Sequence, residues 1–186
     1  MEKPNQVVPP GPLRPVPAIG GPFGRVFVDC VGPRPQTEAG SRFLLTVVCV
    51  STGFPGAMPL WRTATAGIAK ALIWVFTVFG LPGAVQTDQW TGFWSRDFGR
   101  TLQSVGVSQS VIGAGRPESW GALKRWHQAL GSVLSGCCHD AGGDWDQGVP
   151  FVLFAVRDAK RESLGFSPAS LVFGCGHTTL NMPDLV

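Results

Sequence analysis

The feature that most constrains the fold is a pair of apolar, β-branched runs near the start of the chain. They read "RVFVDCVG" (25–32) and "FLLTVVCVS" (43–51), and a turn-rich segment separates them. Because the second run is apolar at almost every position, it indicates a strand inside a sheet whose two faces are both covered. "GAMPLW" (56–61) predicts a third strand, and its Pro59 favours the edge of the sheet. The three runs together predict a meander.

Beyond residue 64 the chain alternates between helical and strand patterns. The predicted elements are, in order, a helix (65–79), a strand (83–88), a helix (91–106), a strand (107–112), and helices at 117–136, 144–163 and 167–174. The helix at 117–136 reads "PESWGALKRWHQALGSVLSG", with apolar residues at spacings of three and four, which is typical of an amphipathic helix. Three strands followed by this alternation predict a mixed α/β fold.

Length and composition indicate one folded domain with a hydrophobic core. The chain has 186 residues, and only 15% of them are charged. Residues 1–22 contain seven prolines, so we expect a linker or arm there, a folded domain over 23–174 and a short tail over 175–186. The apolar window around 66–85 is interrupted too early for a membrane span of about 20 residues, and we expect no membrane partner.

The five cysteines and the charge limit the cell compartment and the partners. The number of cysteines is odd and no secretory signal opens the chain, which favours free thiols in a reducing, intracellular compartment. A nuclear location is compatible with this, although no clear targeting signal is present. The net charge of +3 permits a nucleic-acid partner without requiring one. The segment "CCHD" (137–140) matches no familiar zinc spacing, so we expect ordinary packing there.

Two carboxylates stand where a metal site would need them. Asp29 lies inside an apolar strand, and Asp88 ends a short strand just before a turn. A carboxylate in an apolar strand is costly unless it is paired or binds a metal. The simpler alternative is that each aspartate caps a turn or pairs with a basic residue.

The order of several motifs carries a family resemblance. The segments are "VFVDCVGPRPQTEAGSRFLLTVVCV", "FGLPGAVQTDQW", "RPESWGALKRWHQAL" and "LGFSPASLVFG". In this order, and over residues 23–174, the chain resembles the catalytic core of retroviral and LTR-retrotransposon integrases, as a domesticated or decayed copy would. "TDQ" after "GLP" and the closing "LGFSPASLVFG" are the most specific parts. The resemblance implies a ribonuclease H-like fold, a five-stranded mixed sheet flanked by helices.

The resemblance also implies three acidic residues that bind two Mg²⁺ or Mn²⁺ ions for attack on a phosphodiester. Asp29 matches the first position and Asp88 the second, but the third falls on Lys124, with thirty-five residues between it and Asp88. An ammonium group has no lone pair to give a metal. We therefore expect metal binding to be weak or lost and strand transfer to be absent. Our hypothesis is that Lys124 forms a salt bridge with one or both aspartates.

The segment around the missing ligand suggests contact with nucleic acid. Arg116, Ser119, Lys124 and Arg125 cluster near a predicted helix N-terminus, a natural place for a phosphate. An ordinary solvated helix face is the alternative. We expect a nucleic-acid-binding core related to DNA integration, with no small-molecule cofactor. Two alternatives stay open: a residual metal-dependent nuclease or strand transferase, and a protein-interaction module that forms a homodimer through the core.

Overall fold

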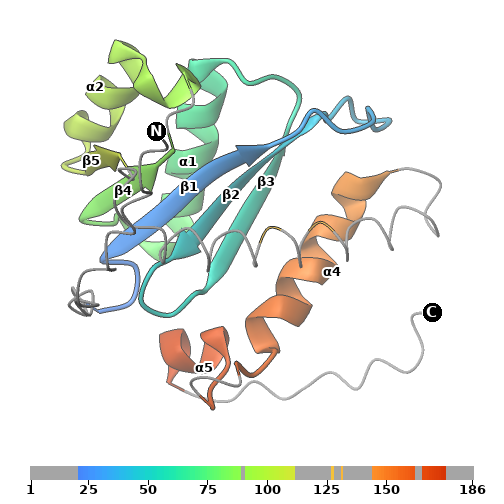
Figure 1. Cartoon of the computed structure of the whole chain (residues 1–186), viewed down its shortest axis with the longest axis vertical. Helices are drawn as coiled ribbons and strands as arrows, with labels where there is room; N and C mark the ends of the chain where they lie inside the picture. The colour runs from blue at the N-terminus through green and yellow to red at the C-terminus, as the bar shows by residue number, and fades with distance from the viewer. Residues whose placement is uncertain are drawn as a thin grey trace, which may run out of the picture.

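A computed structural model describes residues 21–88, 91–111, 127, 131, 144–161 and 165–174, and shows one five-stranded mixed sheet (Figure 1). The strands are β1 (Arg25–Val31), β2 (Phe43–Cys49), β3 (Pro55–Leu60), β4 (Ala84–Thr87) and β5 (Ser108–Val111). Their order in space is β3-β2-β1-β4-β5. The first three strands pair antiparallel, whereas β1, β4 and β5 run parallel. The predicted fold class and the predicted meander are both confirmed.

The places of β2 and β3 follow from their sequences. The apolar strand β2 lies between β1 and β3, and six of its seven residues are buried. Strand β3 lies at the edge of the sheet, as Pro59 predicted, because a proline has no N–H to offer a further strand.

Helices cover both faces of the sheet (Figure 1). The helical elements are α1 (Thr65–Phe79), the 3₁₀ turn η1 (Thr91–Trp94), α2 (Arg96–Ser104), α4 (Trp145–Asp158) and α5 (Pro168–Phe173). Successive residues of a strand point to opposite faces. Accordingly, Val26 and Val28 pack in the core that includes α1 and α2, while Phe27 packs against α4. Among the described helices, none is both long and apolar enough to cross a bilayer.

Two predicted helices have different bounds in the structure. The predicted helix 91–106 is divided, because Ser95 is extended and its side chain accepts a hydrogen bond from the backbone N–H of Phe98, which starts α2 afresh. The predicted helix 144–163 ends at Asp158. There the chain turns extended at Ala159, and Arg161 donates a hydrogen bond to the carbonyl of Gly53.

Other predictions fall largely on residues outside the described part. The predicted linker, the tail and most of the helix at 117–136 lie there, although His127 and Gly131 are both helical. The division of the chain into linker, domain and tail therefore stays a prediction.

Candidate functional site

The parallel pairing of β1 with β4 brings Asp29 and Asp88 to neighbouring positions. Val28 lies opposite Thr87 in the register; Asp29 is the next residue of β1, and Asp88 directly follows the end of β4. Both carboxylates also act electrostatically on the same two side chains, Cys30 and His127. The sequence-based expectation that the two aspartates share one site agrees with this arrangement.

The other predicted site residues lie outside the described part of the chain. These are Arg116, Ser119, Lys124 and Arg125. The salt bridge expected of Lys124 and the phosphate contacts expected of all four therefore stay predictions.

The side chain that does contact Asp29 is His127. Its Nδ1 lies 3.3 Å from Asp29 Oδ2. The other carboxylate oxygen, Oδ1, accepts a hydrogen bond from the backbone N–H of Cys30 at 2.7 Å. Both oxygens of Asp29 are thus engaged by groups of the protein itself.

Thr46 holds the opposite edge of the His127 ring. Thr46 lies opposite Asp29 in the β1–β2 register, and its Oγ1 is 2.9 Å from His127 Nε2. The same hydroxyl donates to the backbone carbonyl of Asp29 at 3.2 Å. We call these three side chains the Asp29–His127–Thr46 clasp. It joins β1, β2 and the segment that carries His127.

The clasp has the bonding order of a nucleophilic relay, with a carboxylate, an imidazole and a hydroxyl in sequence. Thr46, however, is only 1% exposed. Because a substrate cannot reach a hydroxyl at that depth, the arrangement is structural and does not activate a nucleophile.

Burial dominates the protonation of the site. It lowers the pKa of His127, although Asp29 and Asp88 act in the opposite direction. In a neutral ring whose Nδ1–H donates to Asp29, Nε2 is an acceptor, and the one proton of the Thr46 hydroxyl then goes either to Nε2 or to the backbone carbonyl of Asp29. Burial, with added repulsion from Asp29 and Asp88, also raises the pKa of Cys30 to about 12. Cys30 is therefore a neutral thiol at physiological pH and a poor nucleophile or metal ligand.

The described residues do not fit the two-ion site that the resemblance implies. Mg²⁺ and Mn²⁺ need free oxygen lone pairs, and two contacts from the protein already take about half of the acceptor capacity of the Asp29 carboxylate. Within the described ranges, no group of three or more His, Cys, Asp or Glu side chains is arranged to hold a metal ion. An ion at Asp29 would have to compete with His127.

Sequence reasoning missed His127 and Thr46. Each left a weak signal. His127 follows Lys124 by three residues, a spacing that would put the two on one face of the helix predicted from the sequence. Thr46 is the one polar residue of an otherwise apolar strand, "FLLTVVC".

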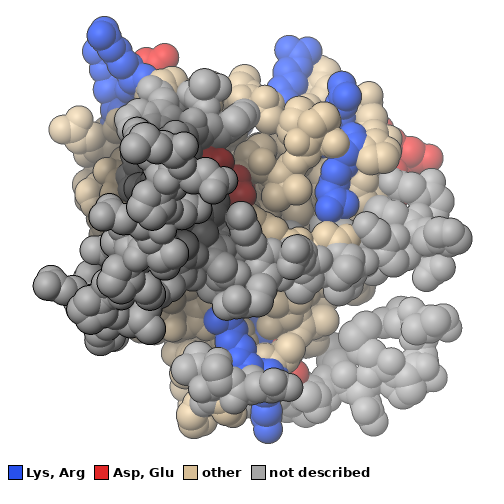
Figure 2. All heavy atoms as spheres, in the orientation of Figure 1, with Lys and Arg blue, Asp and Glu red and all other residues tan. Residues whose placement is uncertain are grey.

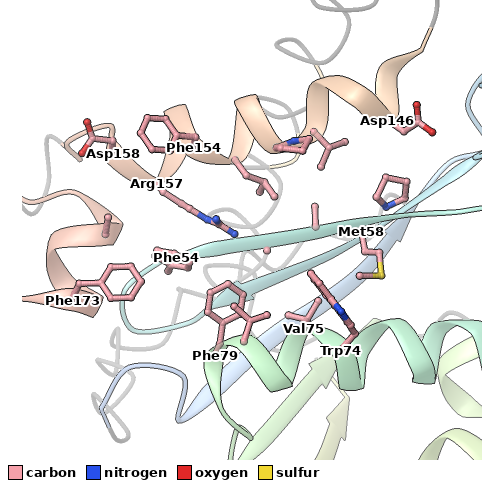
Figure 3. Close-up of a pocket in the computed structure, with 18 residues that line it drawn as sticks. Phe54, Met58, Trp74, Val75, Phe79, Asp146, Phe154, Arg157, Asp158 and Phe173 are labelled. Atoms are coloured by element: carbon pink, nitrogen blue, oxygen red, sulfur yellow. The ribbon is translucent and has the colours of Figure 1, made fainter. Parts of the chain in front are cut away.

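A second feature is an apolar groove between α1, β3, α4 and α5, with a volume of about 570 Å³ (Figure 3). Large apolar side chains on its wall are exposed: Trp74 (57%), Val78 (58%), Phe154 (40%) and Phe173 (54%). Arg157 reaches from α4 toward the sheet, where its Nε donates to the carbonyl of Pro55 at 3.0 Å. The carboxylates of Asp146 and Asp158 point away from the groove (Figure 3). The groove is therefore an unusually apolar surface.

Positive charge is spread out on the described surface. Figure 2 shows the Lys and Arg side chains at separate places on one face and not in one continuous patch. The described residues on this face therefore do not by themselves form a basic track for a nucleic-acid backbone.

Comparison with known proteins gives relatives of the chain and neighbours of its fold among integrases. No family model matches the chain. The chain is 27% identical over 168 residues to the Pro-Pol polyprotein of simian foamy virus type 3 (strain LK3), which covers 90% of the chain and 14% of the polyprotein. It is 23% identical over 172 residues to the Gypsy retrotransposon integrase-like protein 1 of Mus musculus, covering 92% of the chain and 33% of the mouse protein. The chain thus spans a third or less of the length of these relatives.

The structural comparison gives the same result. The HTLV-2 integrase catalytic core domain, solved in complex with magnesium in a trimeric form, matches with a TM-score of 0.68 and 14% identity. The match covers 82% of this chain and 97% of that core. The homologues are retroviral Pol polyproteins and retrotransposon integrase-like proteins, and the fold is that of retroviral integrase catalytic cores.

Proposed function

We propose that this chain is an integrase catalytic core-like domain that binds nucleic acid and no longer transfers DNA strands. The observation that carries the proposal is the state of Asp29. Its two oxygens are engaged by His127 and by the backbone of Cys30, on a fold otherwise shared with integrase cores. Such a domain would act where DNA is present, and the nucleus is the compartment that fits.

Two independent features argue against catalysis. Lys124 stands where the resemblance requires an acidic ligand, and it contributes a positive charge in place of a lone pair. His127 contacts Asp29, the first of the two acidic ligands that the sequence keeps. Either feature would weaken divalent-ion binding, and two ions are what the reaction uses to activate its nucleophile and stabilise its leaving oxygen.

Basic residues around Lys124 favour attraction to phosphate. Lys124 and Arg125, with Arg116 and Ser119 nearby in sequence, would place positive charge and a hydroxyl around one predicted helix end. The net charge of +3 is compatible with such a partner. Phosphate contacts of this kind give an affinity that falls steeply with salt.

Binding is tested by the salt dependence of affinity for a duplex DNA probe, measured by fluorescence anisotropy. We expect Arg116→Ala and Lys124→Ala each to weaken binding and to reduce the salt slope by about one charge contact. Lys160→Ala removes the same charge from an exposed position beyond α4 and serves as the matched control, with no expected change. Absence of any shift at low salt, or an equal loss in the control, would remove nucleic-acid binding from the proposal.

A protein-interaction role is the second candidate, and the apolar groove favours it. Four large apolar side chains on its wall are 40–58% exposed, an arrangement that soluble proteins commonly cover with a partner. A homodimer formed through this face would bury them. This role is compatible with DNA binding, because the groove lies between α1 and α4, whereas Asp29 lies within β1 and Asp88 directly follows β4.

A further inference from the structure

We propose that His127 acts as a built-in substitute for a metal ion: it occupies Asp29 and holds the site together without a divalent cation. The inference rests on the proposed function, because it concerns the same carboxylates. It assigns part of the loss of metal binding to His127, separately from the effect of Lys124.

The His127 ring occupies space beside Asp29 Oδ2. A divalent ion binds a carboxylate oxygen at about 2.0–2.6 Å, depending on the metal. His127 Nδ1 lies 3.3 Å from Oδ2. An ion placed on the same side of the oxygen would overlap the imidazole, so the ring must leave before that side can bind metal.

Thr46 contacts the side of the His127 ring that faces away from Asp29. Thr46 Oγ1 contacts Nε2 at 2.9 Å, and Thr46 belongs to β2, an interior strand of the sheet. If the ring swings away, this contact is lost and a hydroxyl that is 1% exposed loses a partner. The rotation that would free Asp29 is therefore opposed from two sides.

The clasp links segments of the chain that a metal ion would otherwise link. A metal ion at this position would join side chains from different segments through Asp29. His127 joins β1, β2 and its own segment through two contacts, and a ring N–H is the hydrogen-bond donor to the carboxylate. The site is thereby closed by the chain itself.

The test uses the full chain with Mn²⁺ as the probe, and the free ion is followed by electron paramagnetic resonance. Lys124→Glu supplies the missing carboxylate, and His127→Ala is added to it. We expect the double variant to bind Mn²⁺ at least about tenfold more tightly than Lys124→Glu alone, and Asp29→Asn to abolish the gain. Thr46→Val in the Lys124→Glu background loosens the ring without removing it and should give a smaller gain. This variant keeps the test valid if His127→Ala folds poorly.

The outcomes separate this inference from the proposed function. Equal Mn²⁺ affinity of Lys124→Glu with and without His127→Ala or Thr46→Val would overturn the clasp as a metal competitor, while the loss of catalysis through Lys124 would stand. A gain that survives Asp29→Asn would overturn it too, because the ion would then lie elsewhere. Tight Mn²⁺ binding with DNA cleavage by the wild-type chain would instead refute the proposed function.

Discussion

Thr46→Val isolates the energy of the clasp. The substitution keeps the shape of the side chain and removes one hydroxyl, which makes a 2.9 Å contact to His127 Nε2 and a 3.2 Å bond to the carbonyl of Asp29. One net hydrogen bond contributes about 0.5–1.5 kcal/mol, and leaving a buried partner unsatisfied costs about 1–3 kcal/mol. Because His127 is partly exposed and water can replace one contact, we expect a loss of about 2 kcal/mol in the free energy of unfolding.

The assay is urea unfolding followed by tryptophan fluorescence, with Thr87→Val as the matched control. Thr87 is also fully buried in a strand of the same sheet, but its hydroxyl has no hydrogen-bond partner among the described residues. Replacing that hydroxyl with a methyl group should be neutral or stabilising. If Thr87→Val costs as much as Thr46→Val, the loss comes from β2 or β4 packing and the reasoning about the clasp is wrong.

Three further predictions concern the thiol, the groove and the protonation of the site. The pKa of Cys30 is about 12, against an ordinary 9.0. The folded chain should therefore react with iodoacetamide at pH 8 about a thousandfold more slowly than the unfolded chain, as measured by peptide mass spectrometry. Equal rates would contradict the effect of burial on this thiol. Trp74→Glu should weaken self-association, measured by analytical ultracentrifugation, by at least about tenfold. Trp61 is similarly exposed but lies outside the groove, so Trp61→Glu should leave self-association unchanged. A wild-type chain that is monomeric at every concentration would refute a homodimer formed through the groove. Because the folded pKa of His127 lies below its unfolded value, the unfolded chain binds more protons as pH falls below about 6.5, so stability should drop from pH 7 to pH 5. His127→Asn should lose less over this interval in urea unfolding, and an identical pH profile would contradict the assignment.

The sequence was most informative where one residue type determines local geometry. The predicted bounds of α1 match the structure, and Pro59 located β3 at the edge of the sheet. The break at Ser95 was missed because the flanking residues share one helical pattern, and the capping bond to Phe98 only becomes evident in three dimensions.

The site was predicted only in part, for a physical reason. Asp29 and Asp88 were expected at a site from a family resemblance, and their adjacency depends on a parallel register that no local pattern encodes. The contact between Thr46 and His127 joins residues 81 positions apart, so it leaves no periodic trace in the sequence. The groove was also missed, because exposure of an apolar side chain depends on which helix covers it.

The proposed loss of catalysis is tested by a cleavage and strand-transfer assay on the wild-type chain with a DNA substrate and Mg²⁺ or Mn²⁺. Lys124→Glu and Asp88→Asn are assayed beside it, and each variant is first shown to be folded. We expect no metal-dependent product from the wild type or from Asp88→Asn. Metal-dependent product from the wild type that disappears in Asp88→Asn would contradict this expectation, because the site would then be catalytic despite Lys124 and His127.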